Sequence, residues 1–293
     1  MGGPRWANRL ALLITLLLVL GPLCFFGTQL EIAAWYAAAG QDAAWDKQPS
    51  KAIEQYTTAL SWAPNQPDYL VLRSEQYLLQ DDLAAALADA KLAYQVAPER
   101  MSTCEAYSTA LVRAGQRDEA VKLWQTLLQE AEQAESARLP IYWNSLAYFQ
   151  ALANQDLDQA LVYINKALER FPAQPGMLDT RGFVYFRQGK QTEALVDLTA
   201  SIASLQQTRA QDERDIGDRA IDTRHQEQLL HEYRRNLAVI YYHRSLVLDA
   251  LARELNDKTQ ADASITRMSH ELQAVRDRES VRSLGFMPDE SLF

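Results

Sequence analysis

The hydrophobic pattern divides the chain into a short, continuous apolar run and a long amphipathic remainder. Residues 10–30 carry no charged side chain, and these 21 residues would form a helix of about 32 Å, enough to cross the hydrocarbon core of a bilayer. Arg5 and Arg9 precede the run and Glu31 follows it, so the positive-inside rule keeps the N-terminus in the cytoplasm. We therefore expect a cytoplasmic segment at residues 1–9 and one transmembrane helix at residues 10–30.

A cleaved signal peptide is the alternative to this anchor. The break at Gly21-Pro22 is typical of the end of a signal's apolar region. The best cleavage site, at residues 37–39, lies well beyond that break. It also lies inside a helix that the expected fold needs. An uncleaved anchor is therefore the preferred interpretation, and a soluble secreted protein remains the alternative.

The amphipathic remainder repeats itself at an interval of 34 residues. Four positions show the interval most clearly, since Ala52, Tyr56, Ala59 and Pro64 are followed 34 residues later by Ala86, Ala90, Ala93 and Pro98. The pattern continues in EAVKLWQTLL (119–128), is delayed by six residues before QALVYINKALERFP (159–172), and resumes in EALVDLTAS (193–201). A fixed interval of this length predicts an array of similar helical units.

These residues resemble the tetratricopeptide repeat family, whose repeats follow a W-x2-L-G-x2-Y…A-x3-F…P pattern. The clearest first helix is LDTRGFVYFRQG, with Leu178, Gly182 and Tyr185 at the large, small and aromatic positions. The resemblance implies an all-α fold, a right-handed α-solenoid of antiparallel helix pairs, with about five units in residues 31–208. Gly40 and Gly182 would be points of close helix approach, filled by Tyr56 and Tyr185.

Helix ends also follow from the sequence. Glycine and asparagine favour the left-handed residue that ends a first helix, and proline ends a second helix. On these grounds we expect ends at Gly115, Asn154 and Gly189, and at Pro64, Pro98 and Pro172. The third and fifth repeats lack the proline, so their second helices are expected to run on.

The last third departs from the interval. Residues 209–230 are densely charged with both signs and are interpreted as an exposed insertion. Residues 231–280 are expected to form an atypical capping pair of helices. The second of these helices, at about 261–278, is predicted from apolar residues spaced three and four apart, namely Ile265, Met268, Leu272 and Val275. The tail at 281–293 would fold back on this cap or serve as a docking peptide.

Composition and charge narrow the function. The formal net charge of −9 is the wrong sign for binding nucleic acid. Since Arg5 and Arg9 supply +2, residues 31–293 carry −9 − 2 = −11, which would hold the repeats away from anionic headgroups. The two cysteines, 80 positions apart, provide neither a disulfide framework nor a zinc ligand set.

No catalytic motif is recognisable, so we expect no enzyme, no metal and no cofactor. All four histidines, His225, His231, His243 and His270, lie in the last third, but none has the spacing of a metal-binding helix motif. The alternative is a cofactor-handling or catalytic accessory subunit that uses these histidine-containing helices.

The resemblance implies that a protein or peptide partner binds the concave face formed by the first helices. The protein would then be a scaffold or adaptor outside the cytoplasm, as in a bacterial inner membrane with a periplasmic solenoid, and a candidate subunit of a membrane complex. The exposed positions of the first helices, in the register of Gly182, give the predicted contacts: Glu75, Glu105, Thr109, Arg113, Asn144, Tyr148, Asp179, Phe183, Phe186 and Arg187.

Overall fold

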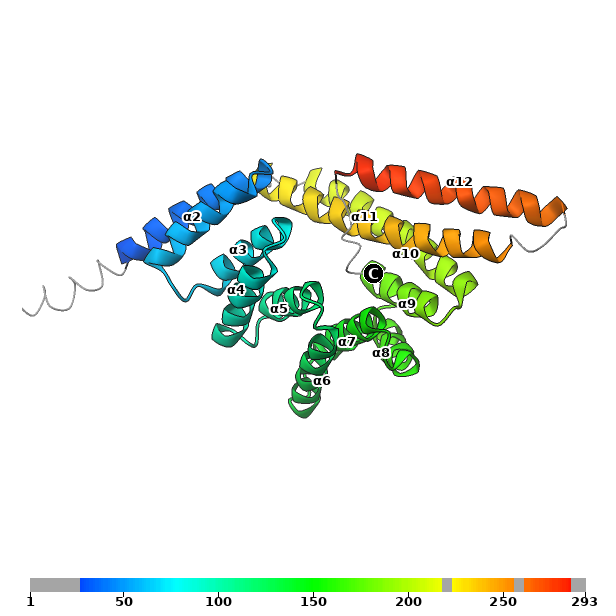
Figure 1. The fold of residues 1–293 in the computed structure, drawn as a ribbon, viewed down its shortest axis with the longest axis horizontal. Coiled ribbons are helices and arrows are strands. Elements are labelled where there is room, and N and C mark those ends of the chain that lie inside the picture. The colour runs from blue at the N-terminus through cyan, green and yellow to red at the C-terminus, as the bar shows by residue number, and fades with distance from the viewer. Residues whose placement is uncertain (1–26, 218–222, 256–260, 286–293) are drawn as a thin grey trace, which may run out of the picture. The chain divides into compact units, whose positions relative to one another are not determined.

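The computed structural model describes residues 27–217, 223–255 and 261–285, and the regular structure in these ranges is α-helical (Figure 1). The chain divides into two compact units, Met1–Gln116 and Arg117–Phe293. Helical pairs make up both units, as the 34-residue interval predicts. Within the described residues, none of the helices combines the length and the hydropathy that a membrane crossing needs. The predicted span at residues 10–30 falls mostly on residues 1–26, which lie outside the described part.

The described part of the first unit begins with helical residues 27–45 and continues with four helices. These are α2 (Pro49–Trp62), α3 (Pro67–Leu79), α4 (Leu83–Val96) and α5 (Met101–Arg113). Local chemistry sets the ends: proline opens α2 and α3, and the Asp82 side chain accepts a hydrogen bond from the Ala85 amide at the start of α4. The expected end at Gly115 is confirmed, because its φ of 77° is left-handed.

The described part of the second unit contains seven helices. They are α6 (Arg117–Gln133), α7 (Leu139–Ala153), α8 (Leu157–Arg170), α9 (Pro175–Arg187), α10 (Gln191–Gly217), α11 (Thr223–Glu254) and α12 (Ala261–Ser283). As expected, α6 and α10 run on where the repeat lacks its proline. Most of the predicted insertion at 209–230 therefore belongs to the helical extensions of α10 and α11, whereas residues 218–222 lie outside the described part.

Close helix approach occurs at both predicted glycines. A Cβ on Gly40 would come within 2.6 Å of the Tyr56 ring, as predicted. A Cβ on Gly182 would come within 2.8 Å of Leu198, so the side chain that fills this approach is Leu198 of α10 and not the predicted Tyr185. Leu198 comes from the partner helix of the pair, whereas Tyr185 lies one turn along the same helix as Gly182.

A recurring ion pair links the two helices of a pair. Arg73 of α3 contacts Asp89 of α4 with two hydrogen bonds of 2.7 and 2.8 Å, and Arg181 of α9 contacts Asp197 of α10 in the same way at 2.6 and 2.8 Å. The two arginines are 181 − 73 = 108 residues apart, which is three intervals of 34 plus the six inserted residues. Each arginine also donates to the preceding second helix, to Thr57 and to Asn165 respectively.

The same ion pair places α11 and α12 in register with the repeats. Arg244 of α11 donates to both carboxylate oxygens of Asp277 at 2.8 Å. Asp277 lies three residues after the buried Ala274, as Asp89 follows Ala86 and Asp197 follows Ala194. In Figure 1, α11 and α12 lie side by side along much of their length. They therefore form a sixth pair with an extended first helix.

The apolar residues that predicted α12 do not lie on its packed face. The helix turns Ala274, Asp277 and Val281 inward, where all three are at most 3% exposed. The apolar residues that predicted this helix lie outside: Ile265, Met268, Leu272 and Val275 are 69%, 68%, 50% and 44% exposed. The predicted helix is present, and it packs on α11 through the small Ala274 and through Asp277, which pairs with Arg244.

Candidate partner-binding surface

The first helices of successive pairs contact one another within each unit. In the first unit α3 contacts α5, and in the second unit α7 contacts α9 and α9 contacts α11. The predicted partner contacts all lie on these helices, in two groups. One group belongs to α3 and α5, and the other to α7 and α9.

The group in the first unit is only partly available for binding. Glu75 and Glu105 are exposed, and Thr109 is half-buried. The Arg113 side chain is turned to its own fold, because it donates to Asp81 in the turn after α3 at 3.2 Å. Arg113 therefore stabilises the α3–α4 turn, and the acidic pair Glu75 and Glu105 is the exposed part of this group.

The group in the second unit centres on a stack of rings. Phe183 of α9 lies 6.2 Å from Tyr148 of α7, 6.4 Å from Phe186, and 4.8 Å from the His243 ring of α11, measured between ring centroids. The Nδ1 atom of His243 lies 2.8 Å from Oδ1 of Asp179. Both Asp179 and Phe183 are thus buried beneath α11, and neither is a surface position in this arrangement.

Tyr148, which contacts the Phe183 ring, and Asn144, four residues earlier on α7, are half-buried. Burial, with a smaller contribution from the nearby Asp179 carboxylate, raises the pKa of the Tyr148 phenol above its ordinary value. Among the described residues, the buried Oδ1 atom of Asn144 has no hydrogen-bond donor. Both side chains therefore place polar atoms in a partly buried part of α7.

Arg187 is the electrostatic exception on this surface. It ends α9 directly after Phe186, and burial lowers the pKa of its guanidinium, with a further contribution from the like charge of Arg117. Its Nε atom is buried and has no acceptor among the described residues. Arg117 is itself held in place by donating to the Leu152 carbonyl at 3.1 Å. The two guanidinium groups thus lie near enough to one another for their like charges to interact.

The histidines of the last third do not come together. His243 is 1% exposed, His270 is half-buried and His231 is exposed. The side chain of His225 lies outside the described part. In the described ranges, no three His, Cys, Asp or Glu side chains are grouped as metal ligands. Asp179 and His243 correspond to two of the three residues of the Ser-His-Asp triad of hydrolases. Both side chains are buried here, with exposures of 10% and 1%.

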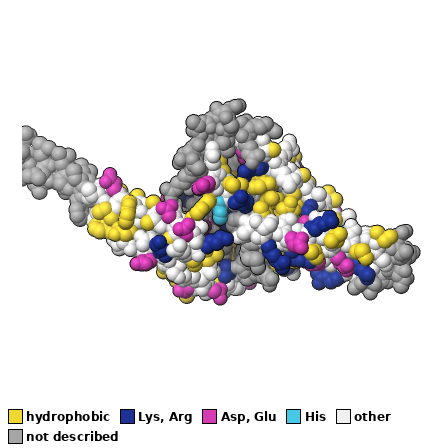
Figure 2. Space-filling view, turned by 90° about the horizontal axis from the view of Figure 1, so that it is seen from above, with side chains coloured by type: hydrophobic (Ala, Val, Ile, Leu, Met, Phe, Trp, Pro, Cys, Tyr) yellow, Lys and Arg dark blue, Asp and Glu magenta, His cyan; other side chains and the backbone are white. Residues whose placement is uncertain are grey.

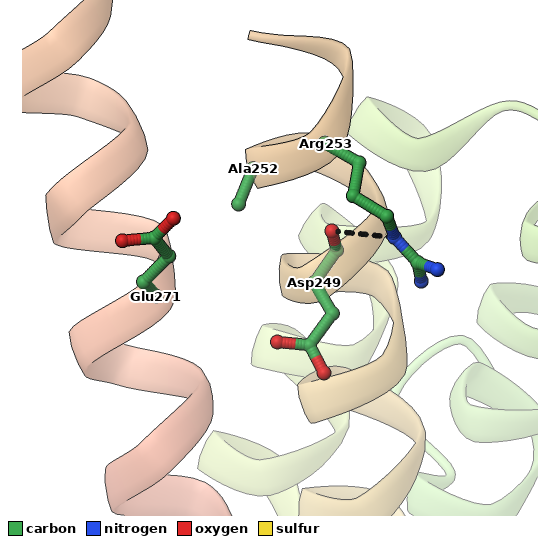
Figure 3. Close-up of a pocket in the computed structure, with 4 residues that line it drawn as sticks. All are labelled: Asp249, Ala252, Arg253 and Glu271. Atoms are coloured by element: carbon green, nitrogen blue, oxygen red, sulfur yellow. Dashed lines mark hydrogen bonds between the residues drawn. The ribbon is translucent and has the colours of Figure 1, made fainter. Parts of the chain in front are cut away.

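A cleft between α11 and α12 is lined by Asp249, Ala252, Arg253 and Glu271 and has a volume of about 320 Å³ (Figure 3). The Asp249 carboxylate accepts from Arg278 at 2.6 Å, and Arg253 donates to the Asp249 carbonyl at 3.1 Å. Its lining has paired charges and no side chain positioned as a nucleophile. The cleft therefore offers no recognisable chemistry.

Comparison with known proteins shows which solved structures have a similar fold. No family model and no curated protein matches the sequence. Among solved structures, a tetratricopeptide repeat protein from Parabacteroides merdae matches 87% of this chain and 79% of its own, with a TM-score of 0.56 and 16% identity. The chain has a helical-repeat fold like that of tetratricopeptide repeat proteins. PilW, a widely conserved type IV pilus biogenesis factor, matches 87% of this chain and 99% of its own, with a TM-score of 0.54 and 12% identity.

Two features of this tetratricopeptide-like fold escaped sequence reasoning. The Arg–Asp pairs were detectable, because Arg73 and Asp89 recur at the correct interval as Arg181 and Asp197. The contact between His243 and Asp179 was not, because the long extensions of α10 and α11 interrupt the interval and hide the register of the sixth pair. Figure 2 shows apolar, acidic and basic side chains interspersed over the face that it displays, so surface charge alone would not have located the site.

Proposed function

We propose that the protein is a membrane-anchored scaffold or adaptor that binds a protein or peptide partner along its first helices. In this proposal residues 10–30 hold it in a membrane, the repeats lie outside the cytoplasm, and the bound partner belongs to a membrane or periplasmic complex. The tetratricopeptide-like fold supports an interaction role because its first helices form continuous rows within each unit. Because one fold serves many functions, the side chains of the site determine what the protein binds.

Arg187 is the observation that carries the proposal. The Arg187 side chain is half-buried, its buried Nε atom has no acceptor among the described residues, and the like charge of Arg117 adds to the cost of this burial. A carboxylate from a partner would relieve both effects, and arginine binds carboxylates with two parallel hydrogen bonds. Phe186 and Tyr148 would contact the apolar part of the same ligand. We infer that the partner presents an acidic side chain or a C-terminal carboxylate to this end of α9.

The test compares an arginine at the site with an arginine outside it. The full chain is used to capture partners from membranes of its source, and captured peptides are assayed in an acidic and an amidated form. Arg187→Gln should abolish capture and remove the preference for the acidic form. Arg170→Gln, at the exposed end of α8, should leave both unchanged. Equal binding by the two variants, or equal binding of both peptide forms, would refute the proposed site.

The anchor is supported by the packing of the first helical segment. Ala33 and Ala37 are buried, and Gly40 lies against the Tyr56 ring. Cleavage at residues 37–39 would therefore remove most of a helix that the first pair needs. Sequencing the mature N-terminus and treating membranes with alkaline carbonate would test the anchor. A mature N-terminus near Gly40, or release by carbonate, would show that the protein is not anchored in this way.

A further inference from the structure

Helix α12 has two faces, and among the described residues one of them is buried and the other is largely exposed. The face that includes Ala274, Asp277 and Val281 packs on α11. The opposite face has four large apolar side chains, all at least 44% exposed, and we call it the α12 seam: Ile265, Met268, Leu272 and Val275. Apolar residues on the surface of a soluble domain are usually scattered, whereas these four form one stripe.

In the other pairs, the residue at the position equivalent to Val275 is covered. Every second helix has an aliphatic residue directly after its buried alanine. In the first five pairs this residue is buried or half-buried: Ile53, Leu87, Val121, Leu161 and Leu195. Val275 is the sixth of this row and is 44% exposed. The α12 seam is therefore an apolar surface that the described residues leave exposed.

The spacing of the seam matches a second copy of the same helix. Its intervals are three, four and three residues, which is the a and d pattern of a two-helix coiled coil. The pattern is also the same in both directions about residue 270, so in an antiparallel pair Ile265 faces Val275 of the other copy and Met268 faces Leu272. A two-fold interface requires this kind of self-complementarity.

Charge also favours self-association through this helix. The chain as a whole carries −9, which opposes contact between copies, but α12 has four arginines and four acidic residues, and 4 − 4 = 0. Two copies can therefore meet at α12 without net repulsion. We propose that the protein forms a two-fold dimer by antiparallel pairing of the α12 seam. The inference goes beyond the proposed partner-binding function and does not depend on it.

The expected dimer is weak. Four side chains per copy bury much less than the roughly 800 Å² per partner of a standard stable interface. We expect a dissociation constant in the micromolar range, on the order of 1 to 100 µM. The dimer should therefore dissociate on dilution, and sedimentation of the full chain at constant detergent concentration will show this.

A matched pair of variants tests the seam. Leu272→Glu should shift the dissociation constant upward by at least about tenfold, because it places a charge in the seam. Leu79→Glu makes the same change at a residue of α3 that is 73% exposed, and should leave the dimer intact. Both sites are exposed, so helicity measured by circular dichroism should not change. Absence of a dimer at about 100 µM, or a dimer that survives Leu272→Glu, would overturn the proposal.

Disulfide formation tests the direction of pairing. Met268→Cys and Leu272→Cys are prepared separately, with Cys24 replaced by serine, and are then mixed under mild oxidation. Antiparallel pairing brings residue 268 of one copy opposite residue 272 of the other, so the mixture should form crosslinked dimers faster than either variant alone. Faster crosslinking within each single variant would indicate parallel pairing and would overturn the proposed arrangement.

Discussion

Removal of Arg181 should destabilise the pair formed by α9 and α10. Asp197 is 8% exposed and its carboxylate accepts two hydrogen bonds from Arg181, which raise the pKa of this arginine. Arg181→Met leaves the carboxylate buried without its partner, which costs about 3–5 kcal/mol for a fully buried pair. Because the Arg181 side chain is 26% exposed, water reaches part of the site and we expect a loss of about 2–4 kcal/mol.

An exposed ion pair in the first unit provides the control. Arg100 and Asp68 form a bridge of 2.8 Å, but their side chains are 48% and 58% exposed. Arg100→Met should therefore cost less than about 1 kcal/mol. In Arg181→Met, replacing Asp197 with leucine as well should recover part of the loss, because the unpaired buried charge is gone.

The assay must resolve single pairs, since unfolding of a repeat array need not be two-state. Amide hydrogen exchange read by mass spectrometry gives the opening free energy of α9 and α10 separately from the other helices. Arg181→Met should accelerate exchange in α9 and α10 by about 30- to 1000-fold, which corresponds to a loss of about 2–4 kcal/mol. Equal effects of Arg181→Met and Arg100→Met would refute the argument from burial.

Three further outcomes are expected. Gly182→Ala should lower the opening free energy of α9 and α10, measured by hydrogen exchange, by about 1–2 kcal/mol, because its Cβ would meet Leu198 at 2.8 Å, whereas Gly176→Ala meets only a flexible side chain at 3.3 Å and should be neutral. Tyr56→Phe should keep or raise the opening free energy of α2, by up to about 1 kcal/mol in the same measurement, because its buried hydroxyl has no partner among the described residues; a clear loss would contradict this. Burial raises the pKa of the Cys104 thiol to about 11, so a thiol reagent at pH 8 should label Cys104 only after unfolding, and rapid labelling of the native protein would show that it is accessible.

Helix boundaries were predictable because the residues that set them act locally. Glycine adopts the left-handed conformation that ends a helix, as Gly115 and Gly189 do here. Proline cannot continue a helix. The close approach at Gly40 was predictable for the same reason, because the interval placed a bulky residue opposite a small one. Such features depend on a few neighbouring residues and on one repeat length.

The orientation of α12 could not be derived in this way. Two of its faces have the three-and-four spacing of a packed helix, and hydrophobicity favoured the face with Leu272. The choice was made by Arg244, more than thirty residues earlier, whose guanidinium binds Asp277 on the other face. Likewise, Asp179 and Phe183 were predicted as groove positions because the sequence did not reveal that His243 would cover them.

The recurring Arg–Asp pair has a consequence for how the pairs respond to temperature. The third repeat has Tyr107 and Leu123 at the positions of this arginine and this aspartate. The fourth repeat, whose first helix lies one residue early, has Leu146 and Tyr163 there. Aliphatic and aromatic side chains thus replace the two charges. Apolar contacts weaken on cooling, whereas the desolvation penalty of an ion pair falls on heating. Neighbouring repeats of one chain are thus stabilised by contributions with opposite thermal trends. The least stable repeat should therefore change with temperature, with the apolar pairs opening first in the cold.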